Sequence, residues 1–258
     1  MRRGDGDAAL TAAQRRAADA GLKALMPIGD RPFLDYVLSS LADAGVTRVG
    51  LVVAPDHAAA AAHYAANPPA RVTLEFVVQP EPRGTADAVL AAQRWTGGHA
   101  FLVMNGDNLY PVPALAALAS LDEPGLPAFD ADDLVRTSNI PAERIRAFAL
   151  IDVDDRGYLT GIVEKPAIAA IPPEGGNSTT ARLISMNVWR FDARIFDACR
   201  DVPQSPRGEY ELPEAVGLAV RRGLLVRAIP AVGPVLDLSR RADAAELERR
   251  LAGVEPRP

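Results

Sequence analysis

The sequence predicts an α/β fold with a doubly wound, Rossmann-like and mostly parallel sheet, and two observations support this prediction. Short apolar runs alternate with helical stretches at the spacing of βαβ units. The runs are also continuous in Val, Leu and Phe, which is typical of strands covered on both faces. With 258 residues, of which 48% are hydrophobic, the chain can bury one substantial core, so we expect a single domain over 1–258.

The first half of the chain follows the alternating pattern closely. Apolar runs of strand length predict strands, and longer stretches with helical periodicity predict helices. In chain order we expect a helix over 32–45, a strand over 49–54, a helix over 56–67, a strand over 72–78, a helix over 84–95 and a strand that ends before 107.

The second half is more mixed. Residues 148–166 resemble a hairpin that turns at Asp155-Arg156-Gly157, and a loop over 172–180 leads into a strand over 182–191. We expect helices over 192–200, 209–221 and 240–252, with a last strand over 226–232 between two of them.

Composition excludes several classes of function. A net charge of -5 without a basic stripe argues against a nucleic-acid binder. The single cysteine, Cys199, excludes an intramolecular disulfide, and the three histidines have no zinc-binding spacing, so we expect a cytoplasmic protein. No stretch is apolar for long enough to span a bilayer, and no signal-peptide pattern is present, so we expect no membrane insertion.

Two aspartates follow apolar runs. Asp107 comes after the run at 101–104, and Asp237 comes after the run at 234–236. Ligands of open α/β sheets bind beyond the carboxyl ends of the strands, where a carboxylate could hold Mg²⁺ together with substrate phosphates. Each aspartate could instead satisfy backbone donors of a turn. If the fold brings both to one rim, they form a plausible metal pair.

A second group of residues begins the helix expected at 84–95. Gly84 and Thr85 are small, and a helix N-terminus favours negative charge, so backbone amides could approach a phosphorylated ligand there. Gly84 could also simply start the turn, and Thr85 could be an N-cap. Gln79 precedes them, and its side-chain amide could read the edge of a nucleobase.

Lysine is rare in this chain, because only Lys23 and Lys165 occur among the 28 basic residues. In so arginine-rich a chain, a retained lysine suggests a need for a compact, strongly hydrated charge. Lys23 could neutralise a triphosphate. Glu164 could accept sugar hydroxyls while Lys165 contacts a phosphate, although the two could also form an ordinary exposed ion pair.

The motifs occur in a recognisable order. They are LKALMPIGDRPFLDYVLSSLADAGV from Leu22, then Gln79-Pro80-Glu81-Pro82-Arg83-Gly84-Thr85-Ala86-Asp87-Ala88, NGDN, VEKP, ISMNVWRF, GEYELPEAV and VLDLSRRAD. This series resembles the sugar-1-phosphate nucleotidylyltransferases from about Leu22 onward. The resemblance implies the nucleotide-diphospho-sugar transferase fold.

The resemblance also implies a role for individual positions. It makes Gln79, Gly84 and Thr85 nucleotide-binding residues and makes Lys23 the lysine that contacts the triphosphate or pyrophosphate. It makes Asp107 and Asp237 the carboxylates that bind the cofactor Mg²⁺, and it assigns catalysis to Lys23, Asp107 and Lys165. The positions implied near the sugar phosphate are Ala149, Glu164, Lys165 and Ser185.

The implied reaction is in-line attack by a sugar-1-phosphate oxygen on the α-phosphorus of a nucleoside triphosphate, with pyrophosphate leaving. Gln79 near Gly84 slightly favours dTTP or UTP over a purine nucleotide. The sequence identifies neither the sugar nor the oligomeric state, and a homo-oligomer is left open.

The chain also departs from the family pattern. Family members usually open with a central strand and a glycine-rich phosphate loop whose arginine helps catalysis, and neither precedes Met1 here. We therefore expect a natural start upstream that adds this strand and loop. The alternative is a catalytically impaired paralogue that binds a nucleotide sugar or sugar phosphate. Two smaller departures are Asn187 and Ser239, which stand where the family often has glycine.

Overall fold

The computed structural model describes residues 11, 14–15, 23–145, 148–163 and 182–258. Its strands are β1 (Pro27–Ile28), β2 (Arg31–Pro32), β3 (Arg48–Val53), β4 (Thr73–Val78), β5 (Phe101–Met104), β6 (Asn108–Leu109), β7 (Gly125–Asp130), β8 (Ala149–Val153), β9 (Leu159–Val163), β10 (Leu183–Ser185), β11 (Val188–Phe191), β12 (Arg227–Ala231) and β13 (Leu236–Asp237). Its helices are the 3-10 turn η1 (Lys23–Leu25) and the α-helices α2 (Phe33–Asp43), α3 (Ala58–Ala66), α4 (Thr85–Ala91), α5 (Gln93–Thr96), α6 (Val112–Ala119), α7 (Ala131–Thr137), α8 (Ala142–Ile145), α9 (Ile195–Asp201), α10 (Leu212–Arg221) and α11 (Asp243–Arg250).

The strands form mixed sheets. The largest has the order β5-β11-β7-β10-β8-β9, with β12 pairing with β7 in parallel. β3 and β4 form a separate parallel pair, and every other pairing among the described strands is antiparallel. The α/β class is therefore confirmed, but parallel pairing is confined to β3–β4 and β12–β7 rather than being general. Short connections such as the β8–β9 turn permit only antiparallel neighbours, whereas α3 provides the crossover between β3 and β4.

Helix α2 shows how the sequence specifies an element. Its apolar residues recur at helical spacing, and Phe33, Val37, Leu38 and Leu41 are all buried. Complete burial of side chains of this size is worth roughly 2 kcal/mol each. The helix ends where Gly45 adopts a φ of 87° and donates its amide to the carbonyl of Ala42 at 3.0 Å.

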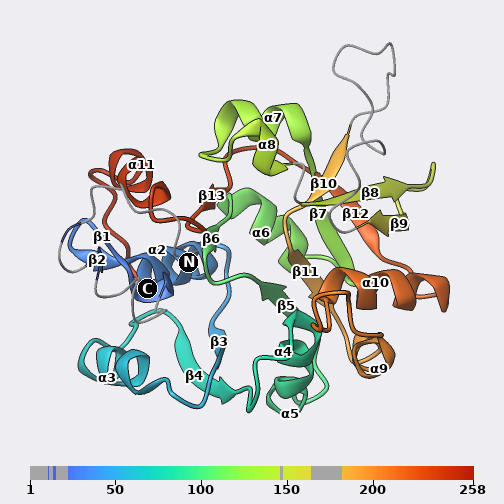
Figure 1. Ribbon diagram of the computed structural model, residues 1–258, viewed down its shortest axis with the longest axis horizontal. Coiled ribbons are helices and arrows are strands. Elements are labelled where there is room, and N and C mark those ends of the chain that lie inside the picture. The colour runs from blue at the N-terminus through green and yellow to red at the C-terminus, as the bar shows by residue number, and fades with distance from the viewer. Residues whose placement is uncertain (1–10, 12–13, 16–22, 146–147, 164–181) are drawn as a thin grey trace.

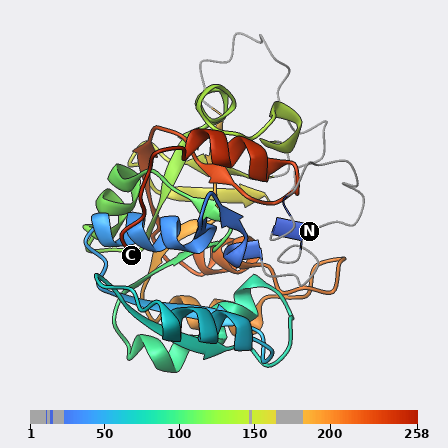
Figure 2. The same cartoon turned by 90° about the vertical axis from the view of Figure 1, so that its left-hand side faces the viewer.

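Helices cover both faces of the large sheet (Figure 1). Strand β7 shows the division, because Leu126 and Ala128 belong to one buried cluster and Phe129 to the other. The first cluster includes residues of α4, α9 and α10, and the second includes residues of α2, α6 and α11. Figure 2 shows α2 in blue and α11 in red on the same side of the molecule.

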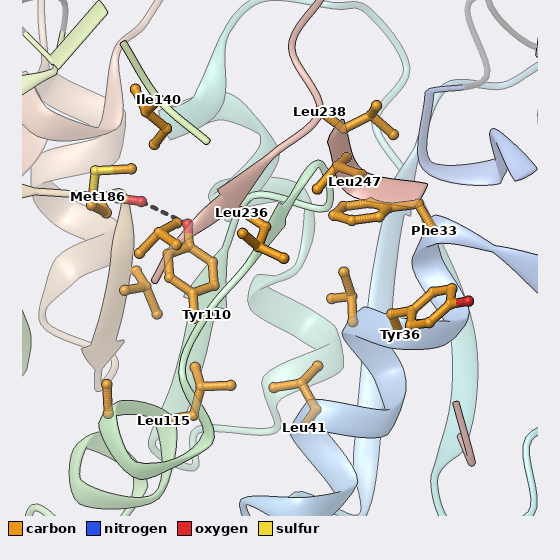
Figure 3. Packing of buried hydrophobic residues seen from close by; sticks show 14 of the residues in the cluster. Phe33, Tyr36, Leu41, Tyr110, Leu115, Ile140, Met186, Leu236, Leu238 and Leu247 are labelled. Atoms are coloured by element: carbon orange, nitrogen blue, oxygen red, sulfur yellow. Dashed lines mark hydrogen bonds between the residues drawn. The ribbon is translucent and has the colours of Figure 1, made fainter. Parts of the chain in front are cut away.

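The cluster that contains Phe129 lies next to the site described below. In Figure 3, the hydroxyl of Tyr110 points toward Met186, and it donates to the Met186 carbonyl at 2.6 Å. Leu236 and Leu238 pack into the same cluster from either side of Asp237. The segment carrying Asp237 is therefore anchored by apolar side chains on both sides.

Strands β3 and β5 each have one edge without a strand partner among the described residues. β3 pairs only with β4, and β5 pairs only with β11. In Figure 1 the β3–β4 pair lies on the side of β5 opposite β11. The residues of β5 are half-buried although their sequence is Phe-Leu-Val-Met, whereas β7 is buried over Gly125–Phe129. The apolar side chains of β5 are therefore less enclosed than those of β7.

No helix in the described part of the chain combines the length and the apolar character needed to cross a membrane.

Candidate functional site

The site forms where β6 pairs with β13. In this antiparallel pair Asp237 lies opposite Asn108, and the amide of Leu238 donates to the carbonyl of Asp107 at 2.9 Å. Two short polar segments, far apart in the chain, are therefore held together by backbone pairing. The structure brings the two predicted metal carboxylates to one place.

Lys23 lies at the same place. Its Nζ is 3.8 Å from Oδ2 of Asp107, and each of the two side chains is 29% exposed. Burial raises the pKa of Asp107 above its ordinary value, while the nearby charges of Lys23 and Arg144 act in the opposite direction. A partly exposed carboxylate beside an ammonium can accept a cation on one side while a phosphate contacts the lysine.

Asp237 differs sharply from Asp107, because its side chain is only 2% exposed. Its Oδ1 accepts from Asn108 Nδ2 at 3.0 Å and from the Ser239 hydroxyl at 2.7 Å. Its Oδ2 is ion-paired with Arg144 and lies 3.3 Å from the amide of Ser239. Both oxygens of this carboxylate are therefore engaged by donors of the protein.

The guanidinium of Arg144 is shared between two carboxylates. Besides Asp237, it contacts Oδ1 of Asp243 at 2.8 Å, and the Arg144 side chain is 10% exposed. The other oxygen of Asp243 accepts from the amide of Arg240 at 2.7 Å. Arg144 is thus a buried cation whose partners come from β13 and from the start of α11.

The fit of these residues to Mg²⁺ differs between the two aspartates. Magnesium is usually held by one or two carboxylates with substrate phosphates and water completing its coordination. The partly exposed carboxylate of Asp107 suits such a site. Both carboxylate oxygens of Asp237 already accept from Arg144 or Ser239, so neither is free to bind a metal ion. The described residues contain no group of three or more His, Cys, Asp or Glu side chains placed to hold a metal ion.

Gln79 lies just after β4, and its side chain is held in a fixed orientation. Its Nε2 donates to Asp87 Oδ2 at 2.8 Å and to the Gly84 carbonyl at 3.1 Å. Both acceptors lack a proton to donate, so the amide nitrogen must face them and Oε1 must face away. The side of the Gln79 amide that faces away from Asp87 and Gly84 is therefore its oxygen, Oε1, which can accept a hydrogen bond.

Gly84 and Thr85 are engaged with the segment that precedes α10. Gly84 has a φ of 118°, and a Cβ there would lie 2.5 Å from the carbonyl oxygen of Tyr210. The hydroxyl of Thr85 accepts from the amide of Leu212, the first residue of α10, at 2.8 Å. Thr85 thus caps the neighbouring helix and not its own. The close approach of Tyr210 explains why glycine is needed at position 84, and the hydrogen bond to Leu212 explains the hydroxyl at position 85.

The residues predicted near the sugar are only partly described. Ala149 and Ser185 are paired across β8 and β10, and both are fully buried. Asn187 has a φ of 57°, which preserves a glycine-like conformation, and its buried Oδ1 has no hydrogen-bond partner among the described residues. Glu164 and Lys165 lie outside the described residues.

Sequence reasoning assigned no role to Arg144, Asp87 or Asn108, although the last two lie within the motifs. Arg144 carries no sequence signal, since it is one arginine of many and its partners are nearly a hundred residues away. Asn108 could have been found because it adjoins Asp107. Asp87 could also have been found, because it occupies the first turn of the helix that begins at Thr85 and so faces the preceding strand end.

Comparisons with known proteins show the family of the chain. Residues 19–233 match the family model described as nucleotidyl transferase. The chain is 28% identical over 247 residues to a glucose-1-phosphate thymidylyltransferase of Streptomyces antibioticus, covering 91% of this chain and 62% of that protein. It is 27% identical over 229 residues to the UTP–glucose-1-phosphate uridylyltransferase AglF of Haloferax volcanii, covering 89% and 87%.

Solved structures with the same fold include a UDP-glucose pyrophosphorylase complexed with UDP-glucose, at a TM-score of 0.70 and 16% identity over 88% of this chain and 89% of that one. The chain spans 55% of the nucleotidyltransferase Agl11 of Haloferax volcanii, to which it is 28% identical over 82% of its own length. By the family match, supported by these relatives, the chain belongs to the nucleotidyl transferase family, in its sugar-1-phosphate nucleotidylyltransferase group.

Proposed function

We propose that this protein transfers a nucleotidyl group from a nucleoside triphosphate, dTTP or UTP, to a sugar-1-phosphate and releases pyrophosphate. The observation that carries the proposal is the meeting of Lys23 and Asp107 at the β6–β13 pair, with the two atoms 3.8 Å apart. A cation and a partly exposed carboxylate side by side suit a metal-bound polyphosphate. We expect the protein to act in the cytoplasm as a single domain.

In this proposal the chain contributes position and charge, since in-line phosphoryl chemistry needs alignment and neutralisation rather than a covalent nucleophile. Asp107 would hold Mg²⁺, which when bound supplies charge neutralisation at the phosphates. Lys23 would contact the triphosphate or the leaving pyrophosphate. Glu164 and Lys165 would bind the sugar and its phosphate, and Ala149 and Ser185 would also belong to this part of the site, as the family resemblance implies.

The orientation of Gln79 supports a preference among the nucleotides. Because Asp87 and Gly84 engage the amide nitrogen, Oε1 is left to accept a hydrogen bond from a base. Uracil and thymine offer an N3–H donor, whereas the unprotonated N3 of cytosine is an acceptor and would oppose Oε1. When Oε1 and cytosine N3 face each other, neither acceptor receives a hydrogen bond, and an unsatisfied polar atom typically costs about 1–3 kcal/mol. We therefore expect dTTP and UTP to be preferred over CTP.

The test is pyrophosphate release from dTTP, UTP and CTP with a panel of sugar-1-phosphates and Mg²⁺. It should be run on this chain and on a form extended by the upstream in-frame codons. Release that depends on both substrates and disappears in Asp107→Asn would support the proposal. Inactivity of both forms, with sugar-nucleotide binding retained, would favour the alternative of a non-catalytic binding protein.

A further inference from the structure

We propose that Arg144 is the resident cationic partner of Asp237, so that Asp107 alone of the two aspartates binds the divalent metal and Asp237 acts as a positioning residue. This inference rests on the proposed function for the role of Asp107. It concerns the pairing within the protein, which metal binding can test without any turnover.

The first argument is that the Asp237 carboxylate has no acceptor position left for a metal ion. A carboxylate accepts at about four lone-pair positions. Here Asn108 Nδ2 and the Ser239 hydroxyl take Oδ1, while Arg144 and the Ser239 amide take Oδ2. With 2% of the side chain exposed, water cannot replace any of these donors without local opening.

The second argument is that the buried guanidinium of Arg144 needs Asp237 as one of its anionic partners. Arginine stays protonated in proteins, so the buried guanidinium needs anionic partners. Asp237 and Asp243 are those partners, and the second contact, at 2.8 Å, comes from a different element. A metal ion on Asp237 would displace the guanidinium from one partner and place two cations against each other in a poorly hydrated space.

The third argument is that Asp237 holds the segment that carries Asp107. The Asp237 carboxylate accepts from Asn108, whose Oδ1 lies 3.4 Å from Nδ2 of Asn105. Its backbone exchanges two hydrogen bonds with the side chain of Asn139, each of 2.8 Å. Asp237 therefore joins the turn before β6, the segment before α8 and β13, which fixes the position of Asp107.

The experiment is a titration of the nucleotide-free protein with Mn²⁺, monitored by electron paramagnetic resonance of the free ion. In Arg144→Gln the carboxylates of Asp237 and Asp243 lose their cation, so Mn²⁺ affinity should rise by at least about fivefold over wild type. An unchanged or lower affinity in a folded Arg144→Gln protein would overturn the proposal.

Asp237→Asn provides a second, independent measurement, because asparagine retains the shape and still accepts from Arg144. Its Mn²⁺ affinity should fall by less than about 100-fold, the upper limit typical for residues that orient a metal ligand, and the affinity of the matched control Asp243→Asn should stay within about threefold of wild type. A loss of more than about 100-fold in Asp237→Asn alone would overturn the proposal. Equal affinities of wild type and Asp107→Asn would instead count against the metal role of Asp107 in the proposed function.

Discussion

At the scale of single residues, Asp107 and Asp237 show how environment separates two similar carboxylates. Asp107 is partly exposed beside one lysine, and burial raises its pKa. Asp237 is enclosed by donors that engage both of its oxygens. The first carboxylate can exchange partners, whereas the second can do so only if the surrounding contacts open.

Asp107→Asn should leave the fold at least as stable as wild type at neutral pH while reducing turnover by roughly 10²-fold or more. A carboxyl whose folded pKa is raised gives stability that is present below its unfolded pKa and lost as pH rises through the folded pKa. Asparagine imitates the protonated carboxyl, so the extra free energy of unfolding of Asp107→Asn over wild type should become smaller as pH falls. Thermal unfolding followed between pH 4 and 8 measures this. A variant that is less stable at pH 7 would mean that the Lys23 pair outweighs burial.

Asp87→Asn should relax the discrimination between UTP and CTP. Asparagine can accept from Nε2 of Gln79 or donate to its Oε1, so only the Gly84 carbonyl still requires Nε2 to face inward. The turned amide, which presents Nε2 to the base, is therefore less strongly disfavoured. We expect the ratio of dissociation constants, measured by calorimetry, to fall by about tenfold, the equivalent of one hydrogen bond. Asp56→Asn, an exposed aspartate, serves as the matched control. An unaltered ratio in Asp87→Asn would remove Gln79 from base selection.

Residue-level prediction from sequence succeeded where a side chain follows an apolar run. Asp107 and Asp237 were singled out in this way, and the structure brings them together with Lys23, although their roles remain predictions. It could not succeed for Arg144, because the identity of its partners depends on how α8, β13 and α11 meet in space.

At the scale of elements, the contact between the start of α4 and the start of α10 can be tested. Gly84→Ala should lower the free energy of unfolding by about 3 kcal/mol, because it combines a φ reserved for glycine with a Cβ 2.5 Å from a backbone oxygen. Gly98→Ala is the matched control, since its φ is also positive, at 82°, but nothing lies within 4 Å of its Cβ.

Urea denaturation of both variants separates the clash from the backbone strain. The control should lose only about 1–2 kcal/mol. Equal losses in the two variants would mean that the segment at Tyr210 moves away at no cost.

The elements that sequence patterns predicted well are those with clear periodicity. The expected helices at 32–45 and 56–67 and the hairpin turning near Asp155 are confirmed. Strand β7 was not predicted, because Pro127 in the middle of Gly125–Asp130 argues against an interior strand. The expected single strand over 182–191 is two strands, β10 and β11, separated at Asn187 with its positive φ.

At the scale of the whole molecule, β3 and β5 each have an edge without a strand partner among the described residues. No strand pairing among these residues joins the β3–β4 pair to the large sheet. Amides of β3 and β5 should exchange with deuterium faster than those of β7, which pairs with β10, β11 and β12. Mass-spectrometric exchange measures this. Equal protection in all three strands would mean that another segment covers these edges.

The overall class was predictable because alternation of helices and strands requires layered packing. Strand order was not, since the antiparallel placement of β11 between β5 and β7 depends on contacts across long separations in sequence. The same long separations limit what any local pattern can reveal about the site.

The pairing of β6 with β13 also has a consequence for biosynthesis. Asp107 emerges from the ribosome well before Leu236 and Asp237, which supply the opposite strand. The turn that carries Asp107 therefore lacks its partner strand while about half of the chain is being made. The ability to capture a metal-bound polyphosphate would therefore arise only when the last tenth of this sequence is being made.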